Sequence, residues 1–234
     1  PALAAAVAAA AATAGVPIDE ANWLAVWSAV CGVWASVHGD RAWLSRRAAR
    51  VPDAALAMAV LLQEVAPPDY AFVLHTVDPT AGAEKGGNAV YVEIVSGAGE
   101  ALVSAAPGRA AAFRAAPDGS NVETLALPSK REGWFAPAGR AGVYARSDSN
   151  GEDLPGFAGA GLYDSIPVPA LAHRTLGYAG DPLFTDAAWR DALVGRLARL
   201  GAHIQAAAGG APQDVEGCVV GEDLVVVQAR PQVV

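Results

Sequence analysis

The last part of the chain constrains the fold most, because residues 213–231 combine two β-type segments with four regularly spaced polar side chains. A valine-rich stretch on either side of a short turn at residues 221–223 predicts a two-stranded hairpin. The polar residues come in pairs two positions apart, so each pair projects from one face of an extended strand. These residues are Asp214 and Glu216, then Gln228 and Arg230.

These side chains are suited to a site for a metal ion and a phosphate. Mg²⁺ is typically held by one or two carboxylates together with phosphate oxygens, and a guanidinium group can bind a phosphate through two parallel hydrogen bonds. Two acids, an amide and an arginine on one hairpin therefore predict a site for a nucleotide and its metal. The alternative is an ordinary exposed hairpin with a charged face.

Composition limits the classes of fold and partner. With 234 residues, 53% of them hydrophobic, and a mean hydropathy of +0.28, the chain can bury the core of one domain or of two small subdomains. The net charge of −8 and the pI of about 4.9 give no basic footprint for nucleic acid. An anionic nucleotide must then be held by a few local arginines and backbone amides.

The two cysteines and the first residues suggest no export, disulfide or membrane signal. Cys31 and Cys218 are far apart and form no CxxC motif, which favours two buried thiols in a reducing compartment. Residues 1–18 are rich in alanine and lack the features of a signal peptide, a transit peptide or a membrane span. We expect a linker or a weak helix there. The chain begins with proline, so we also expect it to be a fragment of something longer.

Hydrophobic spacing predicts the main elements. Aromatic and aliphatic residues three and four apart predict helices over residues 19–38 and 186–208, each with its apolar stripe in the core. Strands are predicted over residues 58–65, 70–77 and 89–96, with the sheet continuing through 103–128 and a short strand at 143–145. His75 lies on one of these apolar strands, and we expect it to be a core histidine with its hydrogen bonds satisfied.

A Ser-, Asn- and Gly-rich segment over residues 146–165 follows the short strand. Such a segment can turn successive backbone N–H groups toward an anion, and Arg146 at its start supplies positive charge. Glu152 and Asp153 oppose simple anion capture and favour a site that also holds a metal or an arginine clamp. The alternative is a mobile surface loop of the same composition.

Four segments together carry a resemblance to a known family. The chain contains, in this order, VWASVHGDRAWLSRR with MAVLLQEVAPPDYAFVLHT, then VEIVSGAGEALVSAAPGR, RSDSNGEDLPGFAGAGLYDSIPV and PQDVEGCVVGEDLVVVQARPQV. Over residues 20–234 it resembles the C-terminal ATP-grasp nucleotide-binding domain of α-glucan water dikinase. Phosphoenolpyruvate synthase and pyruvate phosphate dikinase share these pieces but place the Arg-Ser motif before the QEV strand, which favours the glucan enzyme.

The resemblance implies an α+β fold, an ATP-grasp domain with mostly antiparallel sheets and flanking helices. It also implies ATP and Mg²⁺ as ligands and a dikinase activity. In that family the β-phosphate of ATP passes to a histidine and then to a glucosyl residue of starch-like glucan, while the γ-phosphate passes to water. A plastid location is implied in the same way.

The resemblance also assigns roles to residues of this chain. Asp214 and Glu216 correspond to the Mg²⁺-associated acids, whereas Gln228 and Arg230 correspond to the QxR motif that faces the phosphates. Arg146 corresponds to the phosphate-binding arginine of the RS motif. The QEV motif, which would place backbone groups against adenine, comprises Gln63, Glu64 and Val65. The GLGE loop corresponds to Gly97, Gly99 and Glu100, with Ala98 in place of leucine.

Several parts of the family's machinery have no counterpart in the chain. The phosphorylated histidine, the upstream Gly-Gly-Lys motif and the starch-binding modules belong to other parts of the family's polypeptide, so we expect this chain to be inactive toward glucan alone. Its partners would be the phosphohistidine domain and, through other domains, α-glucan. Two alternatives remain: a non-catalytic ATP-grasp scaffold, or a related dikinase that acts on phosphoglucan or pyruvate.

Overall fold

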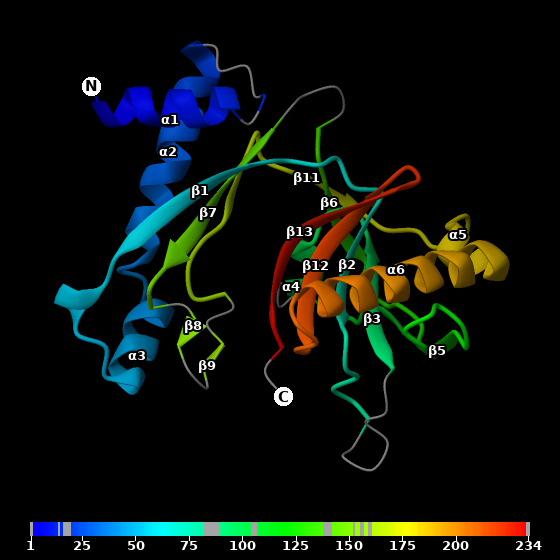
Figure 1. Ribbon diagram of the computed structural model, residues 1–234. Coiled ribbons are helices and arrows are strands. Elements are labelled where there is room, and N and C mark those ends of the chain that lie inside the picture. The colour runs from blue at the N-terminus through cyan, green and yellow to red at the C-terminus, as the bar shows by residue number, and fades with distance from the viewer. Residues whose placement is uncertain are drawn as a thin grey trace. The chain divides into compact units, whose positions relative to one another are not determined.

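The structure is a computed structural model of the chain. It describes residues 2–13, 15, 20–81, 89–103, 107–137, 142–151, 153–154, 157–158 and 161–232. The described part confirms the predicted α+β class, with helices packed on antiparallel sheets (Figure 1). None of its helices has the length and hydrophobicity that crossing a lipid bilayer requires.

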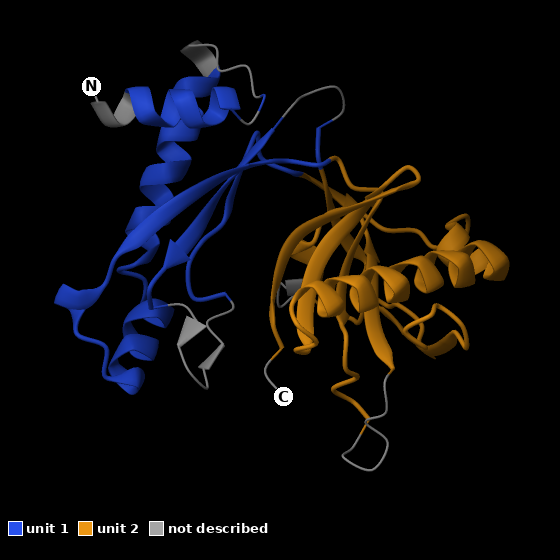
Figure 2. Cartoon of the chain, viewed as in Figure 1, with its two compact units in different colours: residues 1–66, 136–171 blue, residues 67–135, 172–234 orange. Residues whose placement is uncertain are grey.

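The chain folds into two compact units, and each is built from two separate stretches of sequence (Figure 2). Unit 1 comprises Pro1–Ala66 and Ala136–Leu171, and unit 2 comprises Pro67–Phe135 and Ala172–Val234. The passage from unit 1 to unit 2 therefore falls directly after the predicted QEV motif.

Unit 1 consists of a three-stranded antiparallel sheet, in the order β1-β7-β10, with helices beside it. Its elements are α1 (Ala2–Thr13), α2 (Glu20–Ser36), α3 (Asp40–Ala49), the 3₁₀ turn η1 (Asp53–Ala55), β1 (Met58–Glu64), β7 (Val143–Ser149), the short pair β8 (Asp153–Leu154) and β9 (Phe157–Ala158), and β10 (Ile166–Val168). Strand β7 is longer than predicted and includes Arg146, which the sequence placed in a loop.

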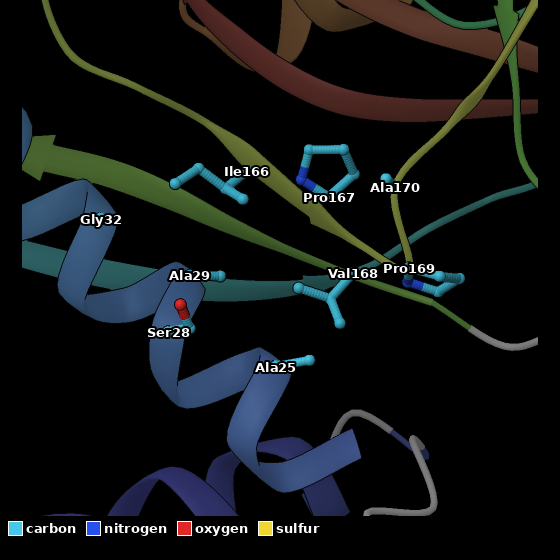
Figure 3. Close-up of a pocket in the computed structure, with 9 residues that line it drawn as sticks. All are labelled: Ala25, Ser28, Ala29, Gly32, Ile166, Pro167, Val168, Pro169 and Ala170. Atoms are coloured by element: carbon cyan, nitrogen blue, oxygen red, sulfur yellow. The ribbon is translucent and has the colours of Figure 1, made fainter. Parts of the chain in front are cut away.

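Helix α2 covers one face of this sheet, as its aromatic stripe predicts. Val30 and Val33 are buried against strands β1, β7 and β10, and Trp27 and Trp34 pack at the edge of the same cluster. Close approach to β10 requires Gly32, since a Cβ atom there would lie 2.6 Å from Ile166 Cδ1. A groove beside this contact is lined by small and apolar residues of α2 and of the segment around β10 (Figure 3). It carries no ionisable side chain, so it does not suit a nucleotide.

Unit 2 is built on a six-stranded antiparallel sheet in the order β13-β12-β2-β3-β4-β5. Its elements are β2 (Tyr70–His75), β3 (Val90–Ser96), α4 (Glu100–Val103), β4 (Ala111–Ala115), β5 (Glu123–Ala126), β6 (Glu132–Phe135), β11 (Ala172–Thr175), α5 (Pro182–Thr185), α6 (Ala187–Ala207), β12 (Gln213–Val220) and β13 (Asp223–Pro231). Strands β6 and β11 form a separate two-stranded sheet.

Helix α6 runs across one face of the large sheet (Figure 1). Leu193 and Leu197 of the helix pack on Phe72, Ile94 and other buried side chains of the strands, as the 3.6-residue period predicts. Because successive residues of a strand face opposite sides, the residues between these core positions project from the other face. We refer to the face opposite α6 as the polar face.

The hairpin β12–β13 contains a β-bulge at the site of interest. Gly217 lies opposite Val226, but Glu216 lies opposite Gln228, so β13 has one extra residue, Val227, at this point. Gly217 faces α6, where a Cβ atom would overlap the ring of Phe72 and approach Val225 O to 2.6 Å. The bulge and the ring packed over it therefore both require glycine at position 217.

We predict that Gly217→Ala destabilises the chain, because the new methyl group has no space between the Phe72 ring and the β13 backbone. The free energy of unfolding should fall by about 1–3 kcal/mol, the usual effect of overpacking a core. Thermal or urea unfolding measures the change. Gly177→Ala is the matched control, since a Cβ atom at Gly177 meets no heavy atom within 4 Å; equal effects of the two substitutions would contradict the prediction.

Candidate functional site

The four predicted residues of the final hairpin lie together on the polar face of unit 2. Asp214 lies directly opposite Arg230, and Glu216 lies directly opposite Gln228. Opposite residues of an antiparallel pair have Cβ atoms about 5 Å apart, so the four side chains form one compact group. The bulge at Val227 creates this group, because in a regular ladder Val227 would pair with Glu216, and Gln228 would lie opposite Val215 and face α6.

Asp214 and Arg230 form a tight ion pair. Both Nε and Nη2 of Arg230 lie 3.0 Å from Oδ2 of Asp214. The Asp214 side chain is 14% exposed and that of Arg230 is 23% exposed, so water screens the pair less than it would on an open surface. The guanidinium is thereby held in one orientation on the polar face, and its remaining N–H donors keep a defined direction.

The polar row continues from Asp214 onto β2 and β3. His75 lies opposite both Asp214 and Tyr91 in the register, and its Nε2 is 3.5 Å from Asp214 Oδ1. The His75 and Tyr91 rings stack with centroids 6.1 Å apart, and the Tyr91 hydroxyl donates to Glu93 at 2.8 Å. Burial, followed by the hydrogen bond to Glu93, raises the pKa of Tyr91 above its usual value, so it stays a protonated donor.

The expectation that His75 is a satisfied core histidine is wrong. Its side chain is 26% exposed on the polar face, and its buried Nδ1 has no hydrogen-bond partner among the described residues. The apolar neighbours of His75 in sequence, such as Leu74, face α6 instead. The alternation along β2 carried the signal, since His75 and Asp214 project from the same face once the strands are paired.

The predicted glycine loop lies at one end of the same polar face. Helix α4 begins at Glu100 and packs over Ala71 and Val95, which belong to that face. The backbone of Gly97 has φ +83°, and a Cβ atom there would lie 2.5 Å from Trp134 O. Gly97 is therefore required by the turn itself. At Gly99, by contrast, the nearest atom to a Cβ is Ala71 Cβ at 3.8 Å, so packing alone does not require glycine.

Unit 1 holds the other predicted side chains on the sheet face opposite α2. Arg146 of β7 lies opposite Leu61 of β1, and its Nη1 donates to Oε1 of Gln63 at 3.1 Å. Leu61 is 54% exposed and provides an apolar surface next to this polar pair. Gln63, predicted to contribute backbone groups, therefore also orients Arg146 through its side chain.

The end of β1 presents backbone groups at a sheet edge. Val65 N–H donates to Gly142 O at 2.8 Å, so the N–H of Val65 is used in the ladder with the β7 side. Alternate residues of an antiparallel strand direct their N–H and C=O groups to opposite sides. The backbone groups of Glu64 thus point away from β7, and β1 is the edge strand of its sheet.

The first turn of the polar segment after Arg146 is held by hydrogen bonds to the chain just before β1. Ser149 Oγ donates to Ala57 O at 3.0 Å, and Asn150 bonds both Ala55 O and Ala57 N. These contacts tie the end of β7 to the segment before β1. Glu152, which we expected to oppose simple anion capture, lies outside the described residues.

The described residues contain no cluster of three or more histidine, cysteine or acidic side chains that could surround a cation. The thiols supply no soft ligand set either: Cys31 and Cys218 are both free, and burial raises the pKa of Cys218 to about 11. The two acids of the hairpin differ in their cross-strand neighbours. Asp214 Oδ1 is buried and Oδ2 faces Arg230, whereas Glu216 lies opposite the amide side chain of Gln228. Glu216 with Gln228 therefore fits a hard cation that takes most of its ligands from phosphate and water.

Comparison with known proteins shows what the chain is similar to. Residues 20–126 match the family model described as pyruvate phosphate dikinase, AMP/ATP-binding domain. The chain is 43% identical over 219 residues to the chloroplastic alpha-glucan water dikinase of Solanum tuberosum, which is 92% of this chain and 14% of that protein. It is 42% identical over 216 residues to alpha-glucan water dikinase 2 of Arabidopsis thaliana, 92% of this chain and 16% of that protein.

A more distant relative carries a different name. The rifampicin phosphotransferase of Streptomyces sviceus is 31% identical over 198 residues, which is 85% of this chain and 18% of that protein. The chain thus spans between 14% and 18% of the length of these relatives. Residues 20–126 thus match the AMP/ATP-binding domain of the pyruvate phosphate dikinases, and over 92% of its length the chain is similar to one part of the α-glucan water dikinases.

Proposed function

We propose that the polar face of unit 2 binds the phosphates of Mg-ATP and that the chain is the nucleotide-binding part of an α-glucan water dikinase. The observation that carries this proposal is the cross-strand group of Asp214, Glu216, Gln228 and Arg230, which the bulge brings to one face. Phosphoryl transfer requires mainly positioning and charge neutralisation from a protein, and this group supplies both.

The phosphates would be held by arginines, because the chain as a whole repels anions. With a net charge of −8, long-range attraction cannot concentrate ATP, so affinity must come from oriented donors at short range. Arg230 is such a donor on unit 2, where Asp214 orients it. Unit 1, considered by itself, holds a second candidate in Arg146, which Gln63 orients. Gly99, Gly97 and Glu100 would place the loop backbone beside the phosphates, where glycine leaves room for close approach.

Mg²⁺ would be held by Glu216, with the amide oxygen of Gln228 as its neighbour, and by the phosphates themselves. When bound, the ion neutralises phosphate charge and draws the phosphate oxygens into a fixed geometry. Asp214, also predicted to associate with the metal, would act through Glu216 and Arg230, because its own oxygens face His75 and Arg230.

Adenine would be recognised at the edge of β1. Adenine has a hydrogen-bond donor at N6 and an acceptor at N1. The C=O of Glu64 would accept from N6, and the N–H of Ala66, two residues further along the extended chain, would donate to N1. The N–H of Val65 is bonded to Gly142 and is not available to adenine, so Val65 would take part through its side chain. The guanine base has the opposite polarity at both positions, so the same edge should reject it.

In the complete enzyme the bound ATP would supply its β-phosphate to a histidine of another domain, from which it passes to glucosyl residues of starch-like glucan. Four relatives named alpha-glucan water dikinase support this acceptor, and three of those names include "chloroplastic", which supports a plastid location. The similarity to a rifampicin phosphotransferase suggests that the acceptor is chosen by other domains and that this domain supplies the phosphate.

We expect the chain to bind ATP more tightly with Mg²⁺ than without it in isothermal titration. Glu216→Gln should remove most of the Mg²⁺ dependence, and Asp214→Asn should weaken Mg-ATP binding roughly 10-fold or more while the chain stays folded, because hydrogen bonds to charged groups contribute about 1.5–3 kcal/mol. A folded chain with no affinity for ATP under either condition would refute the proposal.

The adenine contact predicts nucleotide selectivity. Competition titrations should show at least about 10-fold tighter binding of Mg-ATP than of Mg-GTP, because guanine would leave two backbone groups of the β1 edge wrongly paired. Equal affinity for the two nucleotides would exclude base recognition at this edge, while leaving the phosphate site of unit 2 untouched.

Glucan phosphorylation should need the phosphohistidine domain. With ATP labelled at the β-phosphate, the chain alone should transfer no label to soluble starch. The complete polypeptide of such a dikinase, with its own nucleotide domain replaced by this chain, should restore transfer. Labelling of starch by the isolated chain, or a replacement that binds ATP but transfers nothing, would contradict this division of roles.

A further inference from the structure

His75 belongs to a continuous row of side chains across the polar face. The row runs through the register from Arg230 on β13 to Asp214 on β12, His75 on β2 and Tyr91 on β3. Each member contacts the next: Arg230 and Asp214 by an ion pair, Asp214 and His75 at 3.5 Å, His75 and Tyr91 by ring stacking. Asp214 is therefore flanked on one side by a guanidinium and on the other by an imidazole.

The two oxygens of Asp214 have different neighbours. Oδ2 accepts from Nε of Arg230 and lies 3.0 Å from Nη2 as well, whereas the buried Oδ1 faces His75 Nε2. A buried carboxylate oxygen without a donor costs free energy, and His75 provides the nearest N–H that can reach it after a small ring rotation. Without that donor, nothing on the His75 side would prevent Asp214 from rotating away from Arg230.

The ring of His75 is itself held in place. It lies against Tyr91 with an interplanar angle of 28°, and the hydroxyl of Tyr91 is anchored on Glu93 at 2.8 Å. Nδ1 of His75 is buried with no hydrogen-bond partner among the described residues. A bare lone pair at Nδ1 is less costly than an unsatisfied N–H, so the neutral ring should carry its proton on Nε2, toward Asp214.

We propose that His75 is a positioning residue for nucleotide binding, which fixes Asp214 and through it directs Arg230 toward the phosphates. This inference rests on the proposed function and adds to it a residue that contacts neither nucleotide nor metal. Asp214 then links His75 to Arg230, and it changes ATP affinity by orienting the Arg230 guanidinium. The same effect should therefore be present whether or not Mg²⁺ is added.

A double-mutant cycle on ATP binding tests the link. His75→Phe keeps a ring against Tyr91 and removes the N–H, and should lower the affinity roughly 5- to 30-fold for both Mg-ATP and ATP in EDTA, the range expected for a lost hydrogen bond to a charged group. In an Asp214→Ala background the same substitution should change the affinity by less than about 2-fold, because the link is already broken. His75→Gln retains an N–H donor and should recover most of the affinity.

The controls separate this inference from the function on which it rests. His203→Phe, an exposed histidine on α6, should leave ATP affinity unchanged, and thermal midpoints of all variants should confirm folding. Absence of ATP binding by the unsubstituted chain would refute the proposed function. If the unsubstituted chain binds ATP, three results would overturn the role of His75 alone: unchanged affinity in His75→Phe, an undiminished effect in the Asp214→Ala background, or no recovery in His75→Gln.

A spectroscopic measurement needs no nucleotide. Long-range ¹H–¹⁵N correlation of the histidine side chains should show a proton on Nε2 of His75, and Asp214→Ala should perturb the His75 nitrogens and leave those of His203 in place. A proton on Nδ1, or His75 signals indifferent to the loss of Asp214, would overturn the inference.

Discussion

The β-bulge in the final hairpin is the feature on which the candidate site depends. One inserted residue, Val227, shifts the second half of β13 by one position relative to β12. A shift of one position moves every following side chain to the other face of a strand. Gln228 and Arg230 consequently face the same side as Asp214 and Glu216, and away from the apolar helix α6. Bulges frequently re-aim side chains at functional sites, and Gly217 under the Phe72 ring keeps this one in place.

The two faces of the large sheet of unit 2 thus differ: one forms the core, and the other carries the candidate site. On the side of α6, buried aliphatic and aromatic residues form the largest core of the chain and hold the strands in register. On the polar face, the same register brings polar side chains from four strands into one row. A substitution that leaves the core intact can therefore alter the polar face without unfolding the sheet, which makes binding experiments on this face interpretable.

Elements with a regular hydrophobic period could be predicted from the sequence, whereas local departures from that period could not. Helices α2 and α6 follow a 3.6-residue spacing of large apolar residues, and strands β1, β2 and β3 were located within one or two residues of their observed ends. Helix α3 was missed because its sequence is largely polar, and the bulge was missed because an inserted valine leaves no mark in a valine-rich strand. His75 was misassigned because strand alternation alone does not show which face is polar.

In the proposed site, the ion pair between Arg230 and Asp214 would set how strongly unit 2 attracts phosphate. A carboxylate 3.0 Å from a guanidinium offsets much of its field, so Arg230 is a weaker attractor than an isolated arginine but a better oriented donor. Because the chain has a net charge of −8, phosphate affinity would depend on well-oriented hydrogen-bond donors more than on long-range attraction. In the proposed site, the remaining attraction would come from the metal ion. A site built in this way would favour Mg-ATP over free phosphate, because the anion alone would find oriented donors but little uncompensated positive charge.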